Sequence, residues 1–105
     1  MNHLAELRVS APYLQEHPWV VQGITGFLSA YFMEKPGFRV QLHKTEVETG
    51  MHVWVCELPP KMDMARLIKR LQADIPPGKT ADITHTPDGI PQYLIDLPSN
   101  ETINS

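Results

Sequence analysis

Hydrophobic positions along the chain follow two different periods, and the period changes several times. Residues 5–10 alternate, with Leu7 and Val9 apolar between polar neighbours, which is typical of a half-buried strand. From Pro18 to Met33 the apolar residues recur every three or four positions, which predicts a helix over residues 18–33 with proline in its first turn. The intervening residues 11–17 are interpreted as a connection or a short turn.

A second helix and two hairpins are predicted in the rest of the chain. Residues 38–45 and 51–58 are strand-like on either side of a polar turn, which indicates a β-hairpin. After two prolines, Asp63 is a candidate N-cap for a helix that ends at Pro76. Residues 80–86 and 91–97 then form a second predicted hairpin around Pro87-Asp88-Gly89.

The order of these elements is β-α-β-β-α-β with one extra C-terminal strand, which is the order of a ferredoxin-like, or split β-α-β, arrangement. We therefore expect an α+β sandwich in which two helices cover one face of an antiparallel sheet. The nearly continuous apolar run over residues 51–56 suits a central strand that is buried on both faces. Residues 1–98 are predicted to form one domain, and residues 99–105 a polar, disordered tail.

The loop of the first hairpin decides which side chains share a face of the sheet. An even-numbered loop would gather branched aliphatic residues beneath the helices, and this alternative is favoured because it places them together. The residues expected on the helix side are then Phe38, Val40, Leu42, Val53 and Val55. Those expected on the open face are Arg39, Gln41, His43, His52, Trp54 and Cys56. A three-residue loop with a bulge at Gly50 would instead turn Trp54 into the core.

Composition narrows the class of protein. The 105 residues carry 42% hydrophobic and 20% charged side chains, enough apolar material for one core. The net charge of −3 argues against a general nucleic-acid binder, because phosphate neutralisation needs a basic excess. The first residues lack a secretory pattern, and no apolar run approaches the ~20 residues of a membrane span. A cytoplasmic location without membrane contact is therefore expected.

Few residues suggest catalytic or metal chemistry. Cys56 is the only cysteine, so the chain cannot form an internal disulfide. His43 could lie opposite Cys56 or Trp54 across the hairpin, but a lone cysteine in a strand is usually a small buried hydrophobe. The five histidines show no metal-ligand spacing. We predict no catalytic residue, no metal site and no cofactor.

Two groups of residues are candidates for binding a partner. The first comprises the open-face side chains Arg39, His43, His52 and Trp54, and the second comprises the basic residues in and beside the second helix, Lys61, Arg66, Lys69 and Arg70. The leading hypothesis is a non-enzymatic binding or regulatory module that uses its open sheet face to bind a protein partner or a second copy of itself, as a homodimer. The alternatives are a nucleic-acid-binding accessory protein that uses the basic helix and, third, a small Cys/His enzyme.

Overall fold

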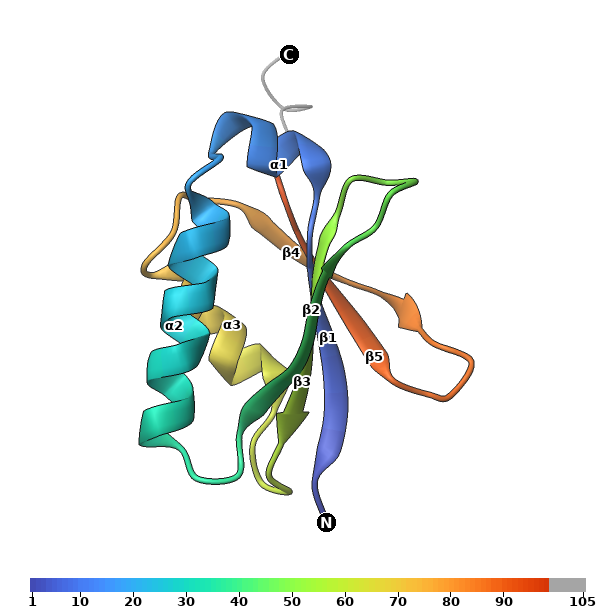
Figure 1. The fold of residues 1–105 in the computed structure, drawn as a ribbon. Helices are drawn as coiled ribbons and strands as arrows, with labels where there is room; N and C mark the ends of the chain where they lie inside the picture. Colours follow the sequence, from blue (N-terminus) through green and yellow to red (C-terminus); the bar gives the residue numbers. More distant parts are fainter. Residues whose placement is uncertain (99–105) are drawn as a thin grey trace.

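The structure is a computed structural model that describes residues 1–98, and of residues 81–83 it describes the backbone alone. This part of the chain contains five strands and three helices. Figure 1 shows their arrangement. The elements are β1 (His3–Val9), α1 (Ala11–Glu16), α2 (Val20–Glu34), β2 (Arg39–Thr45), β3 (His52–Leu58), α3 (Met64–Gln72), β4 (Lys79–His85) and β5 (Pro91–Asp96). The predicted tail, residues 99–105, lies outside the described residues.

The five strands form one mixed sheet in the order β2-β3-β1-β5-β4. β1 pairs antiparallel with β3 and parallel with β5. The predicted ferredoxin-like antiparallel sheet is therefore wrong, because the extra strand does not extend the sheet at its edge but inserts between β1 and β4. Burial gives the physical reason. β5 carries Ile95, which is fully buried, whereas β4 is largely polar (Lys79, Thr80 and Thr84) and suits a solvent-exposed edge.

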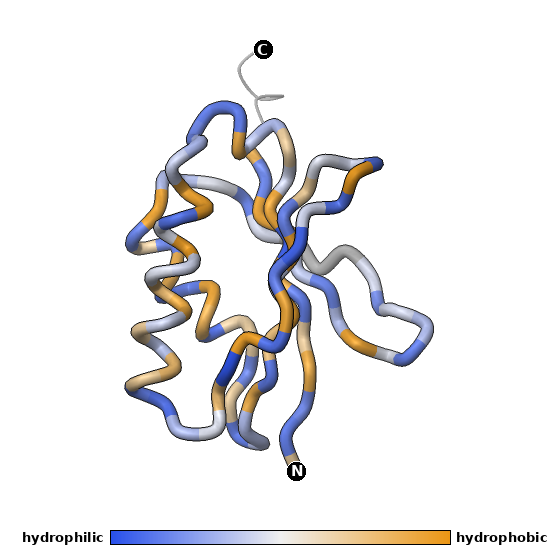
Figure 2. The backbone as a smooth tube through the Cα atoms, in the orientation of Figure 1, coloured by the Kyte–Doolittle hydropathy of each residue, from blue (hydrophilic) through white to orange (hydrophobic). Residues whose placement is uncertain are grey.

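Helices α2 and α3 lie on the same face of the sheet, and α1 lies at one end (Figure 1). The segment expected to be a connection or a short turn contains the short helix α1, which is capped by Ser10, whose Oγ accepts a hydrogen bond from the Tyr13 backbone N–H. Asp63 caps α3 by accepting from the Arg66 N–H at 2.9 Å, as predicted. Hydrophobic residues recur along α2, α3 and the central strands (Figure 2) and form one core cluster between the two layers.

Near its turn, the first hairpin pairs odd-numbered residues of β2 with even-numbered residues of β3, as predicted, but these residues lie on the other face of the sheet. Its turn closes with the Glu46 N–H donating to the Met51 carbonyl, so Thr45 pairs with His52 and His43 with Trp54. These side chains, however, are on the helix side, and Trp54 belongs to the core with 1% of its surface exposed. The expected position of Trp54 on the open face is wrong.

A bulge in β2 explains the error. The register shifts between Val40 and Leu42, so that two residues of β2 oppose one residue of β3. Val40 stays on the helix side opposite Cys56, while Leu42 pairs with Val55 and is 48% exposed. The bulge therefore lies within the strand, not at Gly50, and an alternation that looks continuous in the sequence is broken in space.

Candidate functional site

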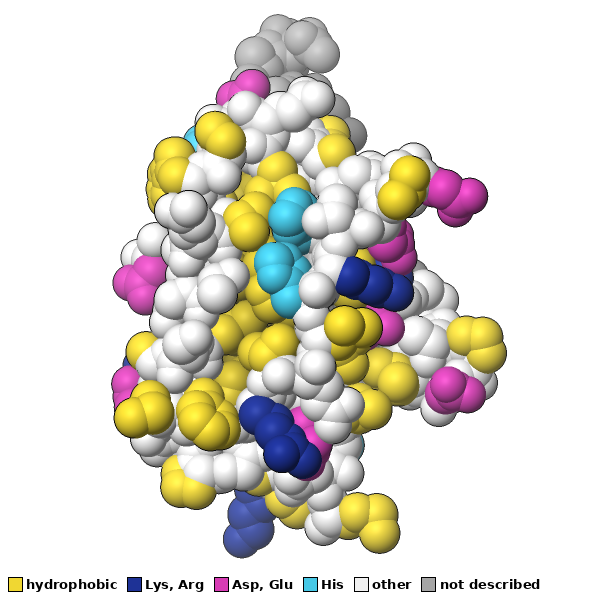
Figure 3. Space-filling model, viewed as in Figure 1, with side chains coloured by type: hydrophobic (Ala, Val, Ile, Leu, Met, Phe, Trp, Pro, Cys, Tyr) yellow, Lys and Arg dark blue, Asp and Glu magenta, His cyan; other side chains and the backbone are white. Residues whose placement is uncertain are grey.

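A groove of about 550 Å³ lies between α2 and the edge strand β2. Figure 3 shows hydrophobic and histidine side chains gathered in this hollow. The residues that line it are Thr25, Leu28, Ser29, Phe32, Met33, Arg39, Val40, His43 and Trp54. We call it the α2–β2 groove. Its volume falls within the range of about 300–1,000 Å³ that is usual for small-molecule sites.

The residue pattern of α2 explains why the groove stays open. One stripe of this helix, including Ile24, Leu28 and Tyr31, is buried against the sheet. The neighbouring stripe carries the small residues Thr25 and Ser29, both exposed. Because β2 is the last strand on this side of the sheet, no further strand fills the space that these small side chains leave.

A stack of aromatic rings forms the inner wall of the α2–β2 groove. The His43 ring lies on the Trp54 indole with centroids 4.4 Å apart and planes inclined by 5°. His43 Nε2 is 3.0 Å from His52 Nδ1, a distance that requires one nitrogen to donate and the other to accept. Burial, followed by the repulsion of His52, lowers the pKa of His43 below its usual value. The pair thus favours a state in which His43 is neutral.

The Trp54 indole contains an unpaired donor. Its Nε1 is the one buried side-chain nitrogen or oxygen without a hydrogen-bond partner among the residues whose side chains the structure describes. A buried donor left unpaired costs roughly 1–3 kcal/mol. Such groups are rare in folded proteins and call for an explanation. Because the whole residue is 1% exposed and the His43 ring stacks on it, this unpaired N–H belongs to the core and is not on the surface of the groove.

Arg39, at the rim of the groove, is held by an acidic neighbour. Its Nε is 3.1 Å from Glu57 Oε1, and Glu57 also accepts from Asn2 and Gln41. These three hydrogen bonds lower the pKa of Glu57, and the one from Asn2 lowers it most. Arg39 nevertheless remains 63% exposed at its side chain, so its charge is screened by solvent.

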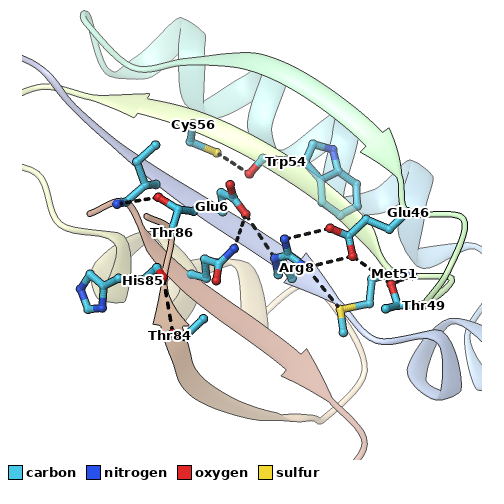
Figure 4. A network of polar contacts seen from close by, with 12 residues as sticks. Glu6, Arg8, Glu46, Thr49, Met51, Trp54, Cys56, Thr84, His85 and Thr86 are labelled. Atoms are coloured by element: carbon cyan, nitrogen blue, oxygen red, sulfur yellow. Dashed lines mark hydrogen bonds and ion pairs between the residues drawn. The ribbon is translucent and has the colours of Figure 1, made fainter. Parts of the chain in front are cut away.

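The opposite face of the sheet carries a polar network whose members pair with one another. Arg8 binds Glu6 at 3.2 Å and Glu46 at 2.9 Å, and Gln92 donates to Glu6 at 3.0 Å, as Figure 4 shows for the labelled members of this network. Burial lowers the pKa of Arg8, but the hydrogen bonds and charges of Glu46 and Glu6 outweigh it and raise the pKa. The open face thus lacks the aromatic platform that the sequence suggested there.

The predicted site residues fall into two separate groups. The α2–β2 groove is lined by His43, Trp54 and Arg39. His52 does not line it but contacts His43 through their ring nitrogens. The basic residues belong instead to α3 and the segment before it, where all four are exposed; they are Lys61, Arg66, Lys69 and Arg70. Arg70 is 3.4 Å from Glu34 of α2 and lies over the Tyr31 ring, so part of the basic excess is neutralised within the fold.

Cys56 is not placed for chemistry with His43. It pairs with Val40 across the hairpin, whereas His43 pairs with Trp54. The cysteine is fully buried, and burial raises the pKa of its thiol to about 12. A thiolate nucleophile is therefore strongly disfavoured at neutral pH. Among the residues whose side chains the structure describes, no group of three or more His, Cys, Asp or Glu is arranged to hold a metal ion.

Sequence reasoning missed the helical wall of the groove. Phe32 falls within the apolar pattern that predicts this helix, but it is 51% exposed, and Met33 beside it is 81% exposed. The signal was present in the width of the apolar arc on this helix, which runs from Val20 and Val21 round to Phe32 and Met33. One sheet face cannot bury an arc that wide.

Comparisons with family models, curated proteins and solved structures give no match. None of the helices described is long and apolar enough to cross a membrane. The function is therefore inferred from the geometry of the chain itself.

Proposed function

We propose that the chain is a non-enzymatic binding module and that its site is the α2–β2 groove, which takes a small organic molecule. The observation that carries this proposal is a groove of ligand size whose lining is mainly apolar and small side chains. Binding sites for small molecules are concave, largely apolar and equipped with a few polar groups that fix orientation. The groove has these properties.

The surroundings of the groove support binding rather than catalysis. Leu28, Phe32, Met33 and Val40 offer apolar contacts, while the raised pKa of the Cys56 thiol and its distance in register from His43 argue against a Cys/His nucleophile. Association with a protein partner or a second copy through the open sheet face stays a prediction, now without Trp54. Nucleic-acid binding by α3 also stays a prediction.

A fragment screen by ¹⁵N-detected NMR tests the proposal, with a groove-filling variant as its control. We expect bound fragments to shift backbone signals of α2 and β2 and the indole signal of Trp54. Ser29 lines the groove, so Ser29→Phe should abolish these shifts. Ala30 is exposed on the same helix outside the lining, so Ala30→Phe should preserve them.

Two outcomes would overturn the proposal. In one, a screen of several hundred fragments gives no saturable shift at the groove. In the other, the shifts persist unchanged in Ser29→Phe. Light scattering on the same samples tests the homodimer prediction, and a dimer that dissociates in Ser29→Phe would identify the second copy as the occupant of the groove.

A further inference from the structure

We propose that His43 and His52 form a two-histidine site for a zinc ion at the edge of the sheet. The inference goes beyond the proposed function and does not rest on it, because the ion would contact two ring nitrogens and needs no occupant in the α2–β2 groove. The observation that carries it is a distance, since His43 Nε2 lies 3.0 Å from His52 Nδ1. The register of the hairpin, and not a sequence motif, brings these two residues together.

The separation of the two nitrogens is close to that of two ligands on one zinc ion. Zinc binds histidine nitrogen at about 2.0–2.1 Å with tetrahedral geometry, and two such bonds place the nitrogens about 3.3–3.4 Å apart. The rings therefore need to separate by only about 0.3–0.4 Å from their present 3.0 Å. They must also turn, so that both lone pairs converge on the ion instead of facing the other ring.

The Trp54 indole holds the His43 ring in an orientation that allows this turn. The two ring planes are inclined by only 5° and their centroids lie 4.4 Å apart, so the stack fixes the plane of the imidazole. A small rotation of the imidazole within that plane changes the direction of Nε2 and keeps the stack. Trp54 thus acts through the face of its ring, and its buried N–H takes no part.

The proton between the two rings can move aside without a change in net charge. In the hydrogen bond, one of the two facing nitrogens carries a proton and the other accepts it. Zinc needs a lone pair on both nitrogens, so this proton must move to the other nitrogen of its own ring. Each ring is then neutral with one N–H, and no proton is released.

Thr45 lies where it can fix the tautomer of His52 that zinc requires. Its Oγ1 is 3.4 Å from His52 Nε2 and can accept a hydrogen bond from an N–H on that nitrogen. Histidines that bind a metal almost always donate their second ring N–H to such an acceptor. A proton held on Nε2 in this way leaves the lone pair of His52 on Nδ1, the nitrogen that faces His43.

The charges around the pair admit a cation. Arg39, on the same strand as His43, is already paired with Glu57. Lys44 follows His43 along β2, so its side chain points to the opposite face of the sheet. Burial and the neighbouring His52 lower the pKa of His43, which keeps its ring in the neutral form that a metal needs. His43 is exposed, so a hydrated ion can reach it.

Titration of the protein with zinc chloride tests the inference, followed by ¹⁵N NMR of the histidine ring nitrogens. Among the described side chains no third His, Cys, Asp or Glu joins the pair, so water fills the other positions of the ion and the site is an exchangeable one. We expect saturable shifts of the ring signals of His43 and His52. The ring of His85, which is exposed at the end of β4, should keep its signals. Calorimetry in a buffer that does not bind zinc gives the affinity.

Single substitutions show whether the two rings act together. Because the second bond to the ion is intramolecular, His43→Gln and His52→Gln should each weaken zinc binding by about tenfold or more. His85→Gln is the matched control and should leave the affinity unchanged. The ring shifts of the unsubstituted chain decide the proposal even if one of the variants does not fold.

Two results would overturn the zinc site. In the first, millimolar zinc produces no saturable shift at His43 and His52. In the second, either His43→Gln or His52→Gln binds zinc as tightly as the unsubstituted chain, which would mean that the two rings do not share an ion. Both results leave the fragment screen of the α2–β2 groove untouched, so the two proposals fail separately.

Discussion

The two faces of the sheet solve the problem of buried polar groups in opposite ways. On the open face, Arg8, Glu6, Glu46 and Gln92 bind one another, so polar side chains that are largely screened from water satisfy each other. On the helix side, Trp54 lies in an apolar environment with its N–H unpaired. The same sheet therefore carries one face on which these polar groups are paired and one on which a buried donor stays unpaired.

This difference teaches where to look for a ligand. A network that pairs its own charges gains little from a further partner, because a ligand would have to replace hydrogen bonds already formed. The α2–β2 groove is therefore the better place for a ligand, because its size and its largely apolar lining suit one.

Replacement of Trp54 has the largest effect that we predict. Because the indole is 1% exposed and packs in the core, Trp54→Ala should lower the free energy of unfolding by about 3–5 kcal/mol. Trp19, at 55% exposure, provides the matched control, and Trp19→Ala should change it by about 0.5 kcal/mol or less. Urea denaturation followed by far-UV circular dichroism measures both. Similar losses in the two variants would contradict the helix-side position of Trp54.

Trp54 also marks the limit of what the sequence could predict. The sequence predicts its cross-strand partner, because an even-numbered loop places His43 and Trp54 on one face, and the two residues pair in the structure. The sequence does not predict which face of the sheet Trp54 occupies. The strand is apolar at almost every position, so Val53 and Val55 are equally good candidates for the core. Where both faces of a strand are apolar, alternation carries no directional information.

The sheet was predictable in its elements and not in its order. All five strand segments and the two long helices appear close to their expected positions. The insertion of β5 between β1 and β4 depends on which strand of the last hairpin finds the better partner in β1. That choice is a tertiary comparison between β4 and β5 and leaves no local signal in either strand. The bulge between Val40 and Leu42 likewise leaves no local signal in the sequence.

The polar network on the open face gives the second prediction. Arg8 and Glu6 are only 15% and 12% exposed at their side chains, so Arg8→Met would leave two carboxylates, Glu6 and Glu46, without their cation. We expect a loss of about 2–3 kcal/mol in the free energy of unfolding, since breaking a largely buried ion pair strands its partner. Thermal denaturation at neutral pH measures the loss.

Arg39 is the control for that prediction. It also pairs with a glutamate, Glu57, but its side chain is 63% exposed, and exposed ion pairs contribute little. Arg39→Met should therefore change the free energy of unfolding by about 0.5 kcal/mol or less. Equal effects of the two substitutions would mean that the open-face network is no more important to stability than a surface ion pair.

The smallest effect we predict is a pH dependence from the groove. The pKa of His43 is lowered below its usual 6.5, first by burial and then by His52, so the unfolded chain binds this proton more readily than the folded chain. The stabilisation is complete above about pH 6.5 and is lost as the pH falls through the lowered pKa. Because His43 is exposed, the loss should stay below about 1 kcal/mol. Urea titrations between pH 5 and pH 7 measure it.

Two substitutions assign that slope to its causes. His43→Gln should flatten the dependence on pH, because the titrating group is gone. His52→Gln should leave a weaker slope, since the repulsion between the rings disappears while the burial of His43 remains. A slope that survives His43→Gln unchanged would show that the proton is bound by another group and would contradict the assignment of this pH dependence to His43.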